Sequence, residues 1–141
     1  MADQLITGTT LIEDRRSGTG IIWSCSGINF TANPANTWTY SGGDFASTDT
    51  LFAKAPVTLP NGVIVTAVIV NCSVSDETWT LNRSLRNAAS SSEALATANM
   101  NTEDITISNE IIDNDTYRYW LETSSIDTGD TIFGARIKYK G

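Results

Sequence analysis

The apolar residues between positions 51 and 59 recur at every second position, and this constrains the fold more than any other feature of the chain. They are Leu51, Ala53, Ala55, Val57 and Leu59. This is the period of side chains on one face of a β-strand, and it does not fit an α-helix. After the turn at 60–62 (PNG), residues 63–72 are apolar at nearly every position, as in a strand that is covered on both faces. Because Asn-Gly between two apolar runs is typical of a hairpin turn, we expect a β-hairpin whose second strand, 63–70, is central and buried.

Strand patterns recur along the rest of the chain, separated by turn residues at short intervals. They cover residues 4–13, 20–30, 37–40, 79–85, 105–107, 117–121 and 133–139. Only residues 87–99 (NAASSSEALATAN) have helical character, and a loop of small residues explains them equally well. The pattern predicts an all-β fold, namely an antiparallel β-sandwich or jelly roll of about eight to nine strands. We expect one domain across residues 1–141.

The charge and the first residues limit the partners and the location. The formal net charge is −7, and an acidic chain repels phosphate backbones and anionic lipids, so we expect neither nucleic acid nor a membrane as a partner. No apolar stretch approaches the roughly 20 residues of a membrane-spanning helix. Residues 1–4 (MADQ) lack the pattern of a secretory signal peptide, which predicts synthesis in the cytoplasm unless a signal has been removed.

The chain has few reactive side chains. It contains no His, which removes the commonest general base and the commonest metal ligand. Its two cysteines, Cys25 and Cys72, fall in predicted strands, and we expect buried free thiols, with a disulfide as the alternative. No glycine-rich phosphate loop precedes a helix. We therefore predict no catalytic residue, no cofactor and no enzyme activity.

Acidic residues are the remaining candidates for chemistry. They are Asp44, Asp49, Asp76, Glu77, Asp113, Asp115, Asp127 and Asp130. Nearly all occur where a turn favours Asp, so a turn role is preferred over a glycosidase-type pair of carboxylates. Residues 113–115 (DND) and 127–130 (DTGD) also gather oxygen ligands suited to calcium. Neither has the EF-hand pattern, and we expect no metal site.

The aromatic residues suggest one candidate surface site. Trp38 and Tyr40 adjoin a Gly-rich turn, where exposed rings would stack on sugar rings. Trp79 and Trp120 lie inside alternating strands, so we assign both to packing.

One part of the chain resembles a known group of domains. Residues 52–70 (FAKAPVTLPNGVIVTAVIV) combine an alternating strand, Leu-Pro-x-Gly and a Val-rich strand, and are followed by 79–83 (WTLNR), 117–120 (YRYW) and 134–139 (GARIKY). In this respect residues 50–141 are similar to β-sandwich domains of bacterial and phage surface proteins, of the capsid-decoration and tail-fibre types. The resemblance implies a virion structural protein, a homotrimer in contact with other virion proteins, and no functional residue is carried over.

Residues 1–20 lie outside this resemblance and carry two apolar pairs, Leu5-Ile6 and Leu11-Ile12. They are a candidate assembly arm that packs on a neighbouring subunit or the capsid, or else the first strand of the chain's own sandwich.

Three functions follow from these patterns, in descending order of preference. The first is a bacteriophage capsid-decoration or fibre protein, located in the virion. The alternative is a carbohydrate-binding or adhesin module of a secreted surface protein, with a glycan as ligand and an extracellular location. The third is a small hydrolase that uses carboxylates alone.

Overall fold

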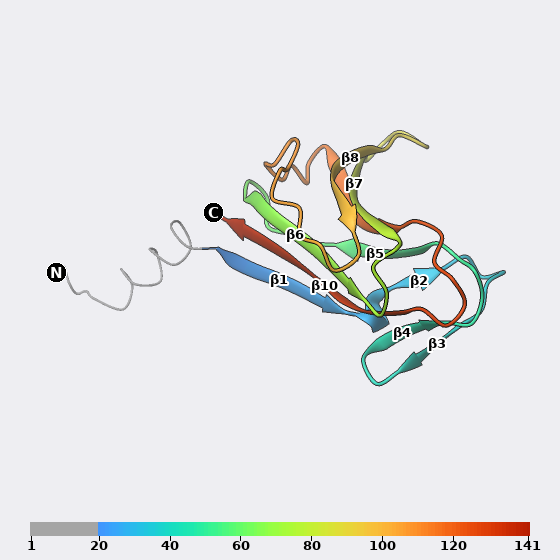
Figure 1. Ribbon diagram of the computed structural model, residues 1–141. Helices are drawn as coiled ribbons and strands as arrows, with labels where there is room; N and C mark the ends of the chain where they lie inside the picture. Colours follow the sequence, from blue (N-terminus) through green and yellow to red (C-terminus); the bar gives the residue numbers. More distant parts are fainter. Residues whose placement is uncertain (1–19) are drawn as a thin grey trace.

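The computed structural model describes residues 20–141, which form two antiparallel β-sheets packed face to face (Figure 1). The first sheet contains β1 (Ile21–Ser26), β3 (Trp38–Ser41), β4 (Asp44–Ser47), β6 (Ile64–Cys72) and β10 (Thr131–Lys140). The second sheet has the order β2 (Thr31–Ala32), β5 (Ala53–Val57), β9 (Tyr117–Thr123), β7 (Thr78–Leu85), β8 (Glu93–Asn99). The predicted all-β sandwich is confirmed, with ten strands. Among these residues, no helix has the length and apolar character needed to cross a membrane.

Strand β10 is the central strand of the first sheet. It pairs with β6 along one edge, and with β1 and then β4 along the other. The predicted strand 20–30 is shorter than expected: β1 ends at Ser26, and a 3-10 turn, Gly27–Asn29, follows it. Beyond this turn, β4 replaces β1 as the partner of β10. Gly27 is required there, because a Cβ would lie 2.2 Å from the backbone oxygen of Ile132 and 2.4 Å from the backbone nitrogen of Phe45.

Strands β5 and β6 do not form the predicted hairpin. They belong to different sheets, so the Asn61-Gly62 turn carries the chain from one sheet to the other. The edges of β5 are taken by β2 and β9, and β6 pairs with β10. Residues of the chain's later part secure the turn: the Asn114 amide donates to the Leu59 carbonyl oxygen at 2.8 Å. The local turn signal was correct, but tertiary pairing decided which strands lie side by side.

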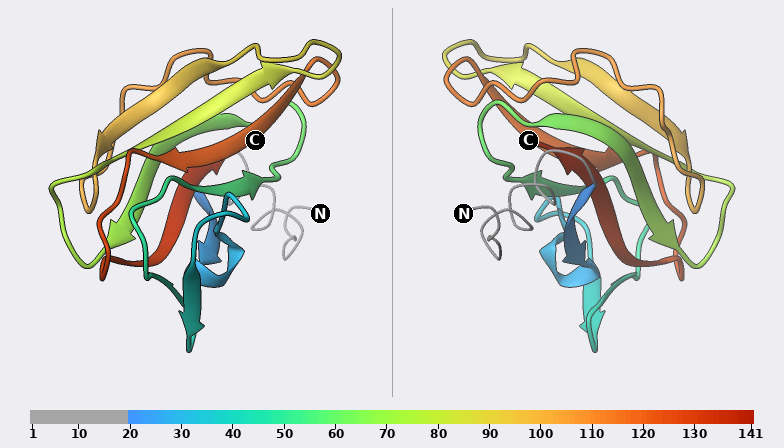
Figure 2. Two further views of the ribbon diagram at one scale, coloured as in Figure 1. Left: turned by 90° about the vertical axis from the view of Figure 1, so that its right-hand side faces the viewer. Right: turned by 90° about the vertical axis from the view of Figure 1, so that its left-hand side faces the viewer.

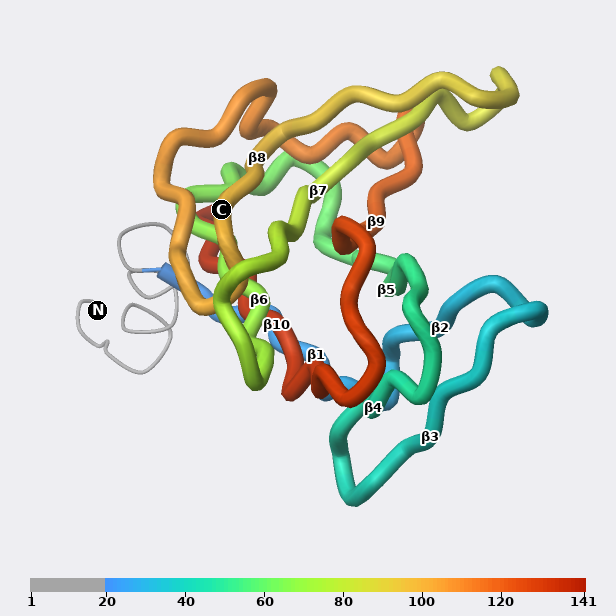
Figure 3. The backbone as a smooth tube through the Cα atoms, turned by 45° about the vertical axis from the view of Figure 1, so that its right-hand side comes forward, coloured from blue at the N-terminus to red at the C-terminus, as the bar shows by residue number. Residues whose placement is uncertain are grey.

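Strand β6 is buried as predicted, although only β10 forms a strand ladder with it. Its other edge is covered by the irregular segment 100–112, which Figure 3 shows in orange beside β6. Val68 exchanges backbone hydrogen bonds with Asp104 at 3.0 and 2.9 Å, and Val65 donates to Glu110 at 2.9 Å. The side chain of Val68 has no exposed surface. The segment therefore protects an edge that would otherwise be open to pairing.

Two local predictions in the later half of the chain were wrong. Within 87–99, residues Glu93–Asn99 form β8, which pairs with β7. The small side chains of this segment allow a helix or a strand, and pairing with β7 selects the strand. Residues 105–107 form no named strand, and Ile105 is 72% exposed.

The core lies between the sheets and contains Phe30, Phe45, Val68, Trp79, Leu81, Leu121 and Ile137. Trp79 is fully buried, as its assignment to packing predicted. Cys25 and Cys72 are free thiols, and burial raises the pKa of both.

Candidate functional site

The outer face of the second sheet carries the side chains best suited to bind a ligand. On β9 the buried residues are Tyr119, Leu121 and Thr123, so the alternate residues Arg118, Trp120 and Glu122 point away from the core. The assignment of Trp120 to packing was therefore wrong: its ring is partly exposed on this outer face.

Side chains of the neighbouring strands β5 and β7 lie beside these residues of β9. In the antiparallel register, Pro56 of β5 and Asn82 of β7 lie opposite Trp120 on either side. In the next outward row, Lys54 of β5 and Thr80 of β7 flank Glu122. Directly opposed residues on one face lie within contact distance of each other. The outer face thus has a row with Trp120 at its centre next to a polar row with Glu122 at its centre.

Two adjoining depressions cross this face, and together we name them the outer groove. One has a volume of about 520 Å³ and is lined by Thr31, Ala32, Asn33, Asn36, Phe52, Lys54 and Glu122. The other has a volume of about 500 Å³ and is lined by Thr31, Lys54, Ala55, Pro56, Arg118, Tyr119 and Trp120. Thr31 and Lys54 line both, so the depressions adjoin each other. Phe52, which is 58% exposed, lines the first depression, and Trp120 lines the second.

Hydrogen bonds hold part of the outer groove in place. The Trp120 indole donates to Glu122 Oε1 at 2.9 Å, and the Asn82 amide lies 3.5 Å from the same oxygen. At the opposite rim, Asn36 donates to Asp49 Oδ2 at 3.1 Å. Lys54 forms no ion pair with any other described residue. Its ammonium group is therefore available to a ligand bound in the outer groove.

The chemistry of the outer groove suits binding rather than catalysis. Glu122 is the one carboxylate that lines it among residues 20–141. Hydrolysis by the glycosidase mechanism needs two carboxylates that flank the scissile bond. Exposed apolar rings combined with an ammonium, a carboxylate and amides fit a ligand that has apolar faces and polar edges.

The residues singled out from the sequence lie elsewhere. Trp38 and Tyr40 belong to the β3–β4 hairpin of the first sheet, which projects from the body (Figure 2). The Trp38 ring stacks on Phe45 with 5.8 Å between ring centroids, and the Tyr40 hydroxyl donates to the Phe30 carbonyl oxygen at 2.8 Å. The structure does not bring these two aromatics to the outer groove. Leu5, Ile6, Leu11 and Ile12, the candidate assembly arm, lie outside the described residues.

No protein-family model matches the chain, and no curated protein matches it. Solved structures with a similar fold include the C-terminal CBM6 of LamC, a laminarinase from Zobellia galactanivorans, with 14% identity, a TM-score of 0.47, and coverage of 83% of this chain and 98% of that one. A second is CBM86, a xylan-binding module from Roseburia intestinalis, with 13% identity, a TM-score of 0.47, and coverage of 86% and 97%. A third is TmCBM61 in complex with β-1,4-galactotriose, with 11% identity, a TM-score of 0.44, and coverage of 92% and 94%.

These comparisons correct the first functional hypothesis. The structures named above are β-sandwich carbohydrate-binding modules, rather than capsid-decoration or tail-fibre proteins of phages. A resemblance to β-sandwich domains is supported, but its assignment to phage-type proteins is not. The virion role and the virion location are withdrawn with it, and neither a homotrimer nor contact with other virion proteins has support.

Proposed function

We propose that this chain is a non-catalytic carbohydrate-binding module and that the outer groove binds a neutral polysaccharide. The observation that carries the proposal is the partly exposed Trp120 in the outer groove, with Pro56 opposite it on the neighbouring strand. A sugar ring has an apolar face of C–H groups, which a flat indole and a proline ring can cover together. Aromatic side chains with one apolar surface and one polar handle are well suited to such contacts.

The polar residues of the outer groove match the edges of a sugar ring. Glu122 accepts hydrogen bonds from hydroxyl groups, Lys54 donates them, and Asn33 and Asn36 can do both. Lys54 and Glu122 balance each other in the outer groove, and the Arg118 guanidinium donates to the Leu85 and Ala88 carbonyl oxygens. The chain as a whole, with a net charge of −7, disfavours acidic sugars. The proposed ligand is therefore uncharged, and a polysaccharide ligand would place the protein in the extracellular space.

Affinity gel electrophoresis against xylan, laminarin, galactan, mannan and polygalacturonate tests the proposal. We expect retardation by at least one of the four neutral polymers and none by polygalacturonate. Trp120→Ala should abolish the retardation, while Trp38→Ala, the matched control on the other sheet, should retain it. Absence of retardation by every neutral polymer, or equal retardation of the Trp120→Ala variant, would show that the outer groove is not a polysaccharide site.

A further inference from the structure

Strand β1 has one edge that no other strand of residues 20–141 pairs with. Its first edge pairs with β10 along the whole strand, from Ile21 to Ser26. Figure 1 shows β1 at the margin of the first sheet, next to β10. The backbone N–H and C=O groups of a strand alternate between its two edges, so a set of these groups on β1 points away from β10. Such an edge is a template for a further strand.

The side chains of β1 are also incompletely covered. Trp23 and Cys25 pack against the core, yet both are only partly buried. Their partners in the register of β10, Ile137 and Ala135, are buried. The contrast is expected when a strand has a neighbour on one side only. Apolar side chains of a strand added beside β1 would cover Trp23 and Cys25.

The outward face of the same sheet is basic at this place, although the chain has a net charge of −7. The outward side chains at the end of β10 are Arg136, Lys138 and Lys140. Lys138 lies 3.6 Å from Glu103, whereas Arg136 forms no ion pair with any other described residue. In the register, Arg136 lies opposite Ser24 of β1. Because the Ser24 side chain is small, the guanidinium of Arg136 can extend across β1 toward the open edge.

We propose that the open edge of β1 binds an acidic peptide segment of a partner protein as an additional strand. Main-chain hydrogen bonds along the edge require a polypeptide, which favours a peptide over an anionic polysaccharide. Apolar residues at every second position of the added strand cover Trp23 and Cys25, and carboxylates at the positions between them lie on the outward face. That strand lies about 10 Å from β10, because neighbouring strands are roughly 4.8 Å apart. Arg136 extends toward the carboxylates across this distance.

This edge is separate from the outer groove, which lies on the second sheet, whereas β1 belongs to the first. A partner bound at β1 therefore leaves the outer groove accessible, and its binding does not depend on a glycan. A second copy of the chain suits the edge less well. Pairing two β1 strands would bring two basic faces into one sheet, and like charges oppose such an association.

Fluorescence anisotropy of a labelled synthetic peptide, titrated with the full chain, tests the edge. The probe has about eight residues in which Glu alternates with Val, and the control peptide has Lys in place of Glu. We expect saturable binding of the Glu peptide only, weakened in about 0.5 M NaCl. Arg136→Glu should lower the affinity at least roughly tenfold, and Arg136→Ala should lower it less. The matched control Arg86→Glu, at an exposed position after β7 of the second sheet, should leave it unchanged.

Amide hydrogen exchange followed by NMR locates the contact. The bound Glu peptide should slow the exchange of those amides of residues 21–26 that point away from β10. The proposal is overturned by no saturable binding of the Glu peptide, by equal binding of the Lys peptide, by unchanged binding in both Arg136 variants, or by binding without protection of residues 21–26. Protection of the same amides in the free protein would also overturn it, because the chain itself or a second copy would then occupy the edge.

Discussion

The indole Nε1 of Trp120 donates a hydrogen bond across 2.9 Å to Glu122 Oε1, two residues further along β9. Residues two apart on a strand share a face, so this bond sets the orientation of the ring on the outer groove. The same oxygen is approached by the Asn82 amide from β7. Glu122 therefore has two roles in the proposed site: it contacts the ligand and it positions the ring.

Removing this carboxylate should weaken glycan binding. We expect Glu122→Ala to lower the affinity for the best-bound polysaccharide about tenfold, because both a ligand contact and the ring orientation are lost. Glu122→Gln keeps an acceptor for the indole and should lose less. Isothermal titration calorimetry measures both. An Ala variant with wild-type affinity would remove Glu122 from the site.

A charge placed in β6 should prevent folding. Val68 has no exposed surface and faces the core, so Val68→Asp would bury a carboxylate with no partner. We expect insoluble protein, or protein without a cooperative melting transition by circular dichroism. The control Thr66→Asp, at a partly exposed position of the same strand, should remain soluble. A soluble, cooperatively melting Val68→Asp protein would contradict the burial of β6.

Among the basic residues of 20–141, Arg83 should contribute most to stability. Its Nε lies 2.9 Å from Glu93 Oε1, and its guanidinium carbon lies 3.7 Å from the centroid of the Tyr117 ring. Because Arg83 is buried, we expect Arg83→Ala to lower the free energy of unfolding by about 2 kcal/mol. Urea denaturation measures this change. Arg136→Ala, at an exposed position of β10, should change it by less than about 0.5 kcal/mol, and equal effects of the two variants would refute the role of Arg83.

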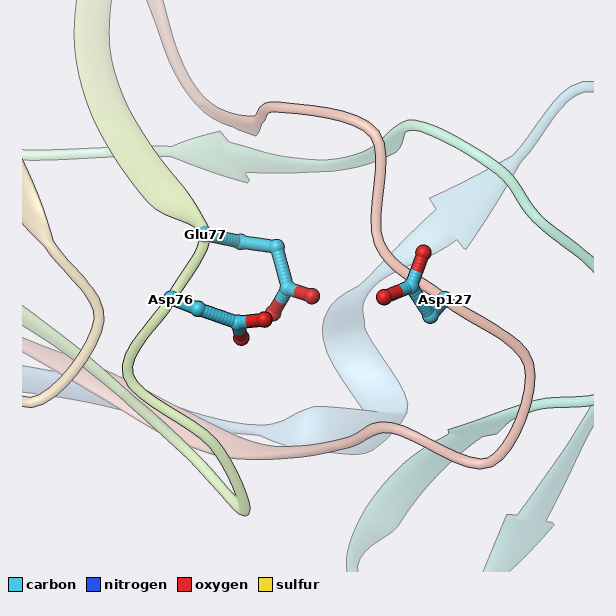
Figure 4. Close-up of side chains that lie close together, drawn as sticks. All are labelled: Asp76, Glu77 and Asp127. Atoms are coloured by element: carbon cyan, nitrogen blue, oxygen red, sulfur yellow. The ribbon is translucent and has the colours of Figure 1, made fainter.

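Glu77 should make the stability of the protein sensitive to pH. Its side chain is directed at Asp127, with Asp76 beside it (Figure 4). Burial, followed by the neighbouring Asp130 and Asp76, raises the pKa of Glu77 from 4.5 to about 8. Between these values the folded protein retains a proton that the unfolded chain has released. The free energy of unfolding should therefore fall as the pH rises from 4.5 to about 8. Melting temperatures measured across this range give the slope, which Glu77→Gln should flatten and Asp115→Asn should not. An equally steep slope in the Gln variant would assign it to other groups.

The outward position of Trp120 could have been predicted from the sequence. Tyr117, Tyr119 and Leu121 alternate along one predicted strand, and Trp120 has the opposite parity. Since one face of an antiparallel sheet commonly meets solvent, the aromatic residue out of phase was the better candidate for a surface site. Trp38 was predicted as a surface site because it adjoins a Gly-rich turn, yet a stacked Phe45 covers part of its ring.

The pairing of β5 and β6 and the surroundings of Glu77 depend on contacts between distant parts of the chain, so the local sequence could not predict them. The Asn61-Gly62 turn has the same local chemistry whether its flanking strands pair with each other or enter different sheets. Glu77 likewise appeared as one of several turn acids. Its proximity to Asp127 follows only once β7 and β10 are assigned to facing layers.

The position of β10 in the chain determines the order in which the sandwich can form during synthesis. It is the last described strand, yet β1, β4 and β6 all pair with it. A ribosome therefore releases three strands of the first sheet before their common partner exists. Until residues 131–140 emerge, these strands keep open edges, which is the state in which β-rich chains associate wrongly. The β3–β4 and β7–β8 hairpins can form early, but the first sheet closes only when its final strand leaves the exit tunnel.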